Sequence, residues 1–286
     1  MTFEPANFER VKLAPARLNL VDMINTVGRA SVPATMFYDI DMTCAEALRS
    51  RFEALGQKIT VTAVLLKSIA IAQRKHPATR TIMLPNGGLI QLNKIEAQFT
   101  VERFVDGGPA LFFGTIKDPE TKPLSEITRE LHRCGTEPIE NIPQLAIQSR
   151  FSKYSSLIRQ IILFIGMRVP KIRIHYMGAT FGFSSLGKYG CKSMISPSVI
   201  TSMFCAGQVV ERPIAVEGKV EIHPMLTLVL NFDHRVLDGA TSARFINDII
   251  DLLLGGLEKH VAEELELLET EQRERQTVGE IPSATV

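Results

Sequence analysis

The residues best suited to chemistry lie near the C-terminus, where a histidine precedes an aspartate by four positions in Asp233-His234-Arg235-Val236-Leu237-Asp238-Gly239. An imidazole with an ordinary pKa of about 6.5 can take a proton from a hydroxyl or thiol nucleophile at neutral pH. The carboxylate of Asp238 can cap a following helix, and Gly239 allows a tight turn. A lone His-x-x-x-Asp most often has only that structural role. The two interpretations are a general base with a supporting carboxylate, and a simple helix cap.

The surrounding elements place these residues in a short loop. Residues 225–233 alternate and are rich in β-formers, which predicts a strand with one apolar face made of Leu226, Leu228, Leu230 and Phe232. From Ala240 the apolar spacing becomes that of a helix, which ends at Gly255-Gly256. His234 and Asp238 therefore lie where a strand gives way to a helix.

The motif as a whole is specific. Five residue types are fixed together, and at about one in twenty for each, chance gives on the order of 10⁻⁴ such matches in a chain of this length. Asp-His-Arg-Val-Leu-Asp-Gly-Ala, followed by Ala-Arg-Phe, resembles the active-site signature of the catalytic domain of 2-oxoacid dehydrogenase acyltransferases, relatives of chloramphenicol acetyltransferase. Three further segments occur in the family's order: Val32-Pro33 with residues 37–42, residues 59–62 at a helix start, and residues 178–187.

This resemblance covers residues 15 to 256 and is strongest after Gly178. It implies an α/β (α+β) fold of the chloramphenicol acetyltransferase type, with a mixed central sheet flanked by helices, and an acyl-CoA-dependent acyltransferase. In such an enzyme His234 would deprotonate the acceptor, and Ser184 would donate a hydrogen bond to the oxyanion formed on the thioester. Transfer in the family is direct, so no acyl-enzyme is expected on Ser184.

Other residues are implied to organise the site. Ser185 supports the segment of Ser184, although the serines with Gly187 could instead form only a turn. In the resembling fold the equivalent of Asp238 holds the active-site loop through an arginine near the N-terminus. This chain has Leu18-Asn19-Leu20-Val21 where the family usually has Ile-Arg-Lys, so Arg17 and Arg29 are the candidate partners. Arg235 and Gly239 are expected to support the loop structurally.

The resemblance also implies an assembly. The family builds each active site between neighbouring subunits, so we expect a homotrimer in which one chain supplies His234 and the next supplies Ser184. A coenzyme A thioester is the expected acyl donor, but no Gly-rich phosphate loop places its contacts. No metal is expected, because the remaining histidines do not have the spacing of metal ligands: His76, His132, His175, His223 and His260.

Composition limits the class of protein. The chain has 286 residues, 45% of them hydrophobic, and a formal net charge of +1. No stretch approaches the roughly 18 apolar residues of a membrane span, and scattered basic residues argue against a nucleic-acid partner. The N-terminus has no secretory signal pattern, and the four cysteines form no Cys-x-x-Cys pair, so reduced thiols and a cytoplasmic location are expected.

The pattern along the chain predicts three parts: an N-terminal arm (residues 1–14), a catalytic domain (15–257) and a charged C-terminal helix and tail (258–286), helical over 261–271. Inside the domain we expect helices at 43–55, opened by a capping box from Thr43 to Glu46, at 61–76 and at 124–132. Hairpins are expected from 97–102 with 110–116, and from 214–216 with 220–222.

Residues 135–177 depart from the family and form an expected insertion. Residues 154–166 are an apolar helix candidate, too short to span a bilayer. This helix could pack on the domain, form a lid over a substrate or lie on a membrane surface.

The acceptor is inferred from what the chain does not contain. It has no room for a lipoyl domain, so no covalently bound lipoyl group is expected. The leading hypothesis is a free-standing acyltransferase that moves an acetyl or other acyl group to a small-molecule hydroxyl in a natural-product pathway, such as tetronate biosynthesis. Two alternatives stay open: a dehydrogenase-complex core that uses a lipoyl domain or another carrier protein supplied in trans, and a non-catalytic assembly protein.

Overall fold

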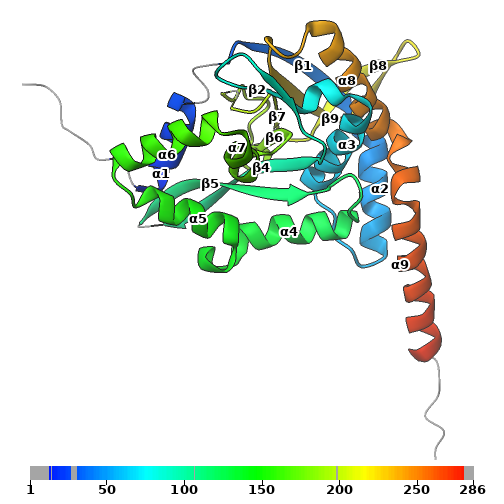
Figure 1. Ribbon diagram of the computed structural model, residues 1–286. Coiled ribbons are helices and arrows are strands. Elements are labelled where there is room, and N and C mark those ends of the chain that lie inside the picture. The colour runs from blue at the N-terminus through cyan, green and yellow to red at the C-terminus, as the bar shows by residue number, and fades with distance from the viewer. Residues whose placement is uncertain (1–12, 14, 27–30, 106, 198, 280–286) are drawn as a thin grey trace, which may run out of the picture.

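A central mixed sheet with helices on both faces organises the computed structural model, which describes residues 13, 15–26, 31–105, 107–197 and 199–279 (Figure 1). The strands are β1 (Pro33–Asp41), β2 (Thr81–Met83), β3 (Leu89–Gln91), β4 (Glu96–Val105), β5 (Gly108–Lys117), β6 (Phe181–Ser185), β7 (Ser202–Ala206), β8 (Val210–Val216) and β9 (Lys219–Asp233). The α-helices are α1 (Pro15–Thr26), α2 (Thr43–Ala54), α3 (Val61–Lys75), α4 (Leu124–Thr136), α5 (Pro143–Ser152), α6 (Ser156–Arg168), α7 (Pro170–Met177), α8 (Gly239–Asp251) and α9 (Glu258–Gly279).

The main sheet has seven strands in the order β1-β9-β7-β6-β4-β5, and β8 pairs with the outer half of β9. β6 runs parallel to β4 and β7, whereas the other neighbours are antiparallel. β2 and β3 form a separate two-stranded sheet. The expected fold class, a mixed sheet flanked by helices, is confirmed.

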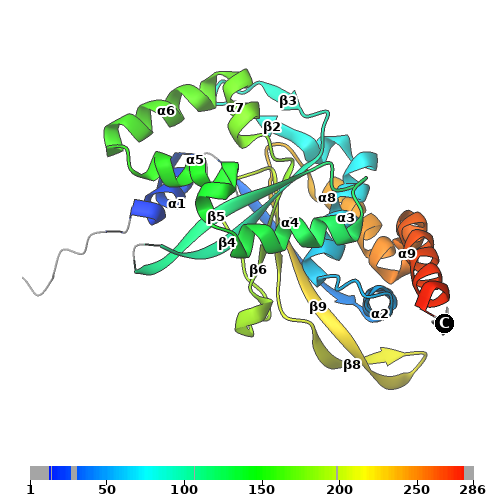
Figure 2. The same ribbon diagram turned by 90° about the horizontal axis from the view of Figure 1, so that it is seen from below.

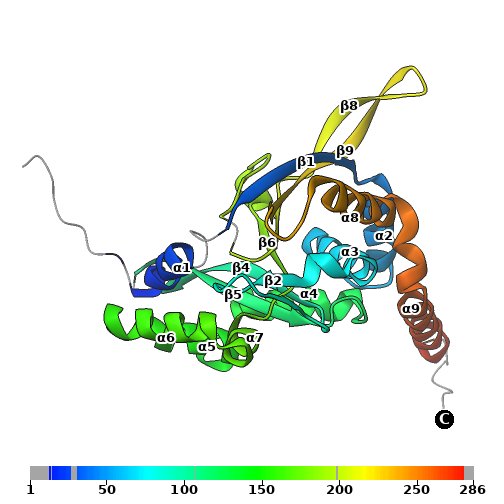
Figure 3. The same cartoon turned by 45° about the horizontal axis from the view of Figure 1, so that its top comes forward.

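One face of the sheet forms the hydrophobic core. Leu226, Leu228, Leu230 and Phe232 are buried at alternate positions of β9, as the sequence predicts. α3 and α8 lie against this face (Figure 3), and the ring of Phe204 on β7 meets Phe245 of α8 edge-on, with centroids 5.8 Å apart.

The opposite face is more polar and carries the candidate site. Thr100 of β4 and Ser184 of β6 share this face because their side chains are hydrogen-bonded, and Asn231 of β9 belongs to it by the alternation of side chains. α1, α5 and α6 gather beside β4 and β5 on this side (Figure 2). The sheet therefore separates an apolar core from a surface on which a ligand can bind.

The structure confirms most predicted elements. The two hairpins form as β4–β5 and β8–β9, and Glu217 and Gly218 have positive φ values of 49° and 80° in the second turn. The helix expected at 61–76 is α3, with Thr60 as its N-cap. β9 is longer than predicted because the second strand of the β8–β9 hairpin runs directly into the motif strand.

The capping box at the start of α2 was predicted wrongly. Thr43 is already the first helical residue, and Met42 is the N-cap and has no side-chain cap bond. The Thr43 hydroxyl donates to Asp41 at 2.6 Å, and Glu46 pairs with Arg49 instead of reaching back. Asp41, two residues before the helix, is therefore the hydrogen-bond partner of its first residue.

The C-terminal helix packs against the domain. Val261 and Leu265 of α9 are buried, and α9 lies beside α2 (Figure 1). Glu264 accepts hydrogen bonds from the backbone N–H of Leu124 at 2.7 Å and of Ser125 at 2.9 Å, so it caps the start of α4. The predicted N-terminal arm, apart from Leu13, and the last residues of the predicted tail lie outside the described residues. No helix in the described ranges is long and apolar enough to cross a membrane.

Candidate active site

His234 lies in the turn between β9 and α8, as predicted, and its side chain is exposed to solvent. Its backbone N–H donates to the carbonyl of Val32 at 2.8 Å, and its ring lies against Phe232, with centroids 5.7 Å apart. The imidazole is therefore anchored at its backbone and is accessible to a substrate.

The neighbouring residues hold this turn rigid. Arg235 donates to both carboxylate oxygens of Asp233, and the backbone N–H of Val32 also contacts this carboxylate, at 3.4 Å. Burial acts to raise the pKa of Asp233, but the hydrogen bonds from Arg235 and Val32 outweigh it and hold the pKa below its ordinary value. Arg235 is thus engaged with Asp233 beside the histidine.

Asp238 caps α8. Its side chain accepts a hydrogen bond of 2.6 Å from the backbone N–H of Thr241, and this bond, helped by the charge of Arg244, lowers the pKa of Asp238. The structure does not bring Arg17 to it: Arg17 lies in the first turn of the distant helix α1 (Figure 1), and no ion pair among the described residues joins the two. Arg29 lies outside the described residues.

The tight turn expected at Gly239 was predicted wrongly. Gly239 is absent from the glycines with positive φ, and a Cβ at this position would meet only the end of Met36, at an ordinary 3.7 Å. It is simply the first residue of α8, where Asp238 has already turned the chain.

Ser184 is buried near the end of β6. Its Oγ accepts a hydrogen bond of 3.0 Å from Thr100 Oγ1 of β4, so the Ser184 hydrogen can itself donate to another acceptor. Ser185, the next residue, is exposed, and as its neighbour on the strand it points the other way. The Ser184 hydroxyl therefore keeps its own hydrogen for another acceptor.

The two proposed catalytic residues do not meet within one chain. The strand register places Ser184 opposite Cys205 and Cys205 opposite Val229, and His234 lies five residues after Val229. At about 3.3 Å per residue and about 4.8 Å between strands, the two residues are roughly 20 Å apart. A site that uses both requires a second chain.

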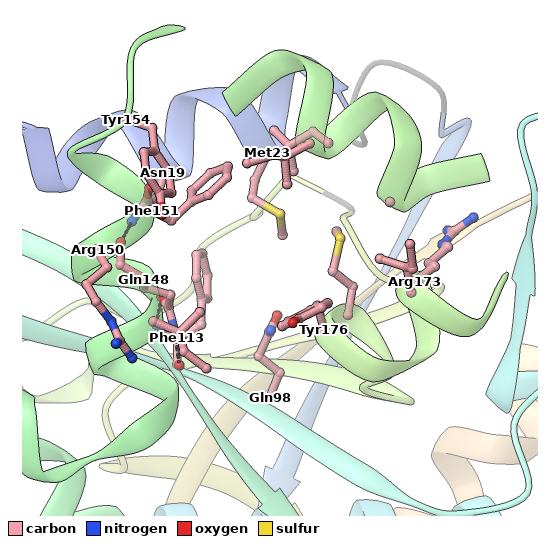
Figure 4. A pocket seen from close by; sticks show the side chains of 16 residues that line it. Asn19, Met23, Gln98, Phe113, Gln148, Arg150, Phe151, Tyr154, Arg173 and Tyr176 are labelled. Carbon is pink, nitrogen blue, oxygen red and sulfur yellow. Dashed lines mark hydrogen bonds between the residues drawn. The ribbon is translucent and has the colours of Figure 1, made fainter. Parts of the chain in front are cut away.

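A cavity of about 460 Å³ opens on the sheet face that carries Ser184. Its floor includes Gln98 of β4 and Phe113 of β5, and Phe113 is paired across the strands with Thr100, the partner of Ser184. Met23, Gln98 and Tyr176 point into the open space (Figure 4). Most of the lining is apolar, which suits an organic ligand of moderate size.

α1, α5, α6 and α7 enclose this cavity. Leu163 of the apolar helix α6 is buried toward it, and Arg159 of α6 forms a buried ion pair with Asp22 of α1, with a distance of 2.6 Å between Nε and Oδ2. The outer face of α6 exposes large apolar side chains: Leu157, Ile158, Ile161, Phe164 and Ile165. The predicted apolar helix therefore exists and serves as a cavity wall.

Sequence reasoning missed several residues of this region. Thr100 and Gln98 belong to no motif, and only the strand register brings them to Ser184. Cys205, opposite Ser184, is a free cysteine whose pKa is raised by burial to about 11, so it is a thiol and not a nucleophilic thiolate. The sequence did contain a signal for a positively charged segment, because residues 141–177 contain six Arg and Lys residues and no Asp or Glu. Among the described residues no three His, Cys, Asp or Glu side chains are placed to hold a metal ion.

Solved structures share this arrangement of a mixed sheet flanked by helices. The dihydrolipoamide acetyltransferase of Azotobacter vinelandii superposes with a TM-score of 0.65 at 24% identity, covering 91% of this chain and 99% of that one. A probable dihydrolipoamide acetyltransferase from Listeria monocytogenes gives a TM-score of 0.63 at 20% identity, over 87% of this chain and 95% of that one.

The family model for the 2-oxoacid dehydrogenases acyltransferase (catalytic domain) matches residues 5–142 and 169–258, and the chain belongs to this family. The family resemblance expected from the Asp233–Gly239 motif is confirmed. The internal segment that the family model leaves unmatched, 143–168, comprises α5 and α6, the helices that help to enclose the cavity.

Curated relatives are longer than this chain. The dihydrolipoyllysine-residue succinyltransferase component of the 2-oxoglutarate dehydrogenase complex from Bartonella vinsonii subsp. berkhoffii is 24% identical over 83% of this chain and 52% of its own length. The acetyltransferase component of the pyruvate dehydrogenase complex from Staphylococcus epidermidis is 25% identical over 77% of this chain and 45% of its own length. The chain thus spans about half the length of these relatives.

Proposed function

We propose that the protein transfers an acyl group from a coenzyme A thioester to the hydroxyl of a small molecule. The observation that carries the proposal is the apolar cavity on the face of Ser184, enclosed partly by α5 and α6, which the family model does not match. A cavity of this size suits a compact organic acceptor. An acceptor from a natural-product pathway, such as a tetronate, belongs to this class.

The chemistry follows from the positions of the two side chains. His234 accepts the proton of the acceptor hydroxyl while its oxygen attacks the thioester carbonyl carbon. The carbonyl oxygen becomes an oxyanion and accepts a hydrogen bond from Ser184. Collapse of the tetrahedral intermediate breaks the C–S bond, the acyl group stays on the acceptor, and the leaving thiolate can take the proton back from His234. Asp238 contributes by fixing the start of α8.

Assembly completes the site. Because Ser184 and His234 lie roughly 20 Å apart in one chain, we propose that a homotrimer brings His234 of one subunit to Ser184 of the next. Val32, whose carbonyl accepts from the His234 backbone, and Phe37 of the edge strand β1 that follows it are 53% and 54% exposed in the single chain and are available for such an interface.

A second candidate is a dehydrogenase-complex core that acts on lipoyl groups carried by another chain. The names of the curated relatives favour it. Release of free thiol from acetyl-CoA separates the two: turnover with small hydroxyl compounds but not with dihydrolipoamide supports the proposal, and the reverse supports the lipoyl-dependent core.

His234→Ala tests whether the protein is an enzyme at all. The variant should lose at least ~10²-fold in turnover, the usual scale for a general base, and should melt at the wild-type temperature because the side chain is exposed. His132→Ala, an exposed histidine on α4, is the matched control and should retain activity. An assembly protein would show no turnover in the wild type, and its biological role would survive the loss of His234.

A further inference from the structure

Arg173 of α7 is a buried cation without a carboxylate partner in the described part of the chain. The residue is 6% exposed, and its Nη1 donates to the backbone carbonyl of Met83 at 2.8 Å. A guanidinium removed from water loses hydration that one carbonyl cannot replace, so buried cations are normally paired with anions.

The other buried arginine of this region shows the usual solution. Arg159 of α6 is 4% exposed, and its charge is neutralised by Asp22. It also donates to the carbonyl of Tyr154 at 2.6 Å. The fold therefore supplies an anion to Arg159 and supplies none, among the described residues, to Arg173.

The Arg173 side chain lies between two cavities. It lines the 460 Å³ apolar cavity, but its guanidinium points away from the middle of that space (Figure 4). It also lines a neighbouring cavity of about 340 Å³ whose wall contains Arg168 and the two residues that flank His234, Asp233 and Arg235. Arg173 thus lies between the 460 Å³ apolar cavity and the cavity beside the turn of His234.

Charge in the smaller cavity is unbalanced. Of the described residues that line it, three are arginines and one is a carboxylate. Asp233 is already engaged by Arg235, and the guanidinium of Arg168 lies over the ring of Phe164. Burial, and then the positive charge of Arg235, lower the pKa of Arg173. A bound anion would relieve both effects, because it pairs with the buried charge and reduces the repulsion between neighbouring cations.

We propose that the cavity bounded by Arg168, Arg173 and Arg235 binds the anionic group of a substrate, a carboxylate or a phosphate. The planar guanidinium of arginine matches both groups with paired hydrogen bonds. Because Asp233 and Arg235 flank His234, an anion held there fixes the substrate's position relative to the catalytic base. This inference rests on the proposed function and narrows its substrate class.

The anion has two possible sources. An acidic acceptor would place its carboxylate at Arg173 and its apolar part in the 460 Å³ apolar cavity, which Arg173 also lines. Alternatively, the phosphates of coenzyme A would occupy the site. The chemistry is the same, and pairs of charged and neutral probes distinguish the sources.

Calorimetric titration of the full chain with one ligand at a time tests the proposal without any turnover, so it is independent of the acyl-transfer chemistry. Decanoate is compared with decan-1-ol, and coenzyme A with pantetheine. The variants are Arg173→Met and Arg173→Gln, the second of which keeps an N–H donor for the Met83 carbonyl. Arg129→Met, an exposed arginine of α4 that lines neither cavity, is the matched control.

Loss of a charge-assisted hydrogen-bond pair should weaken the binding of at least one anion by about tenfold or more in both Arg173 variants. The neutral counterpart of that anion should bind the Arg173 variants as it binds the wild type, and the Arg129 variant should bind every probe as the wild type does. If only the binding of decanoate weakens, the site belongs to an acidic acceptor. If only the binding of coenzyme A weakens, it belongs to the acyl donor. The proposal is wrong if neither anion binds the wild type, if both bind the variants equally well, or if the neutral probes weaken to the same extent.

Discussion

Thr100 determines what the hydroxyl of Ser184 can do. By donating its own hydrogen to Ser184 Oγ, it leaves the serine hydrogen available for a ligand on the polar face of the sheet. The motif around Ser184 could be found in the sequence, but Thr100 lies 84 residues earlier and has no motif of its own. Only the pairing of β4 with β6 reveals it.

Replacing Ser184 with alanine should lower turnover by about 10²–10³-fold, the scale of a lost oxyanion donor, because the developing charge then lacks its hydrogen bond. Steady-state rates of thiol release measure the effect. Ser185→Ala removes an identical group from the other face of the strand and should leave the rate within about twofold of the wild type on the same reasoning. Equal losses in the two variants would contradict the assigned role.

Asp233 gives the active-site turn a defined dependence on pH. Its folded pKa lies below its ordinary value of 3.8, so the carboxylate contributes fully to folding above that value. The contribution is lost as the pH falls from there through the folded pKa. Arg235→Met should therefore raise the pKa of Asp233 in a carbon-detected NMR titration, and its loss of stability should shrink in acid. Arg244→Met, on the exposed face of α8, should leave the Asp233 titration unchanged.

At the scale of elements, local sequence patterns predicted those helices and strands whose formation depends on residues close together in the chain. The alternation in β9 and the helical spacing after Ala240 gave the turn that contains His234. The sequence could not show which helices meet, and the Arg159–Asp22 pair is the example. These residues are 137 positions apart, yet their buried ion pair fastens α6 to α1 over the cavity.

Asp22→Ala should destabilise the protein by about 3–5 kcal/mol, because it leaves the guanidinium of Arg159 buried without its anion. Denaturant unfolding followed by circular dichroism measures the change. The double variant Asp22→Ala with Arg159→Met removes both charges and should recover much of the loss. A single variant as stable as the wild type would show that the pair does not hold the two helices together.

For the whole molecule, the separation of Ser184 from His234 predicts complementation between inactive chains. When Ser184→Ala and His234→Ala chains are assembled together, sites that take the intact histidine from one chain and the intact serine from the other should be active. Random mixing makes about a quarter of the sites complete in a heterologous ring. Recovery of activity on coexpression is the measurement, with each variant alone as the control. A mixture as inactive as its components would show that both residues act within one subunit.

The capping of α4 by Glu264 makes the start of this helix depend on a residue that is translated much later. The two N–H groups that this carboxylate satisfies belong to residues 124 and 125, so α4 leaves the ribosome long before its cap exists. Until α9 has been translated, that helix end must find its hydrogen-bond partners in water. The start of α4 is therefore completed only when α9 folds back against it.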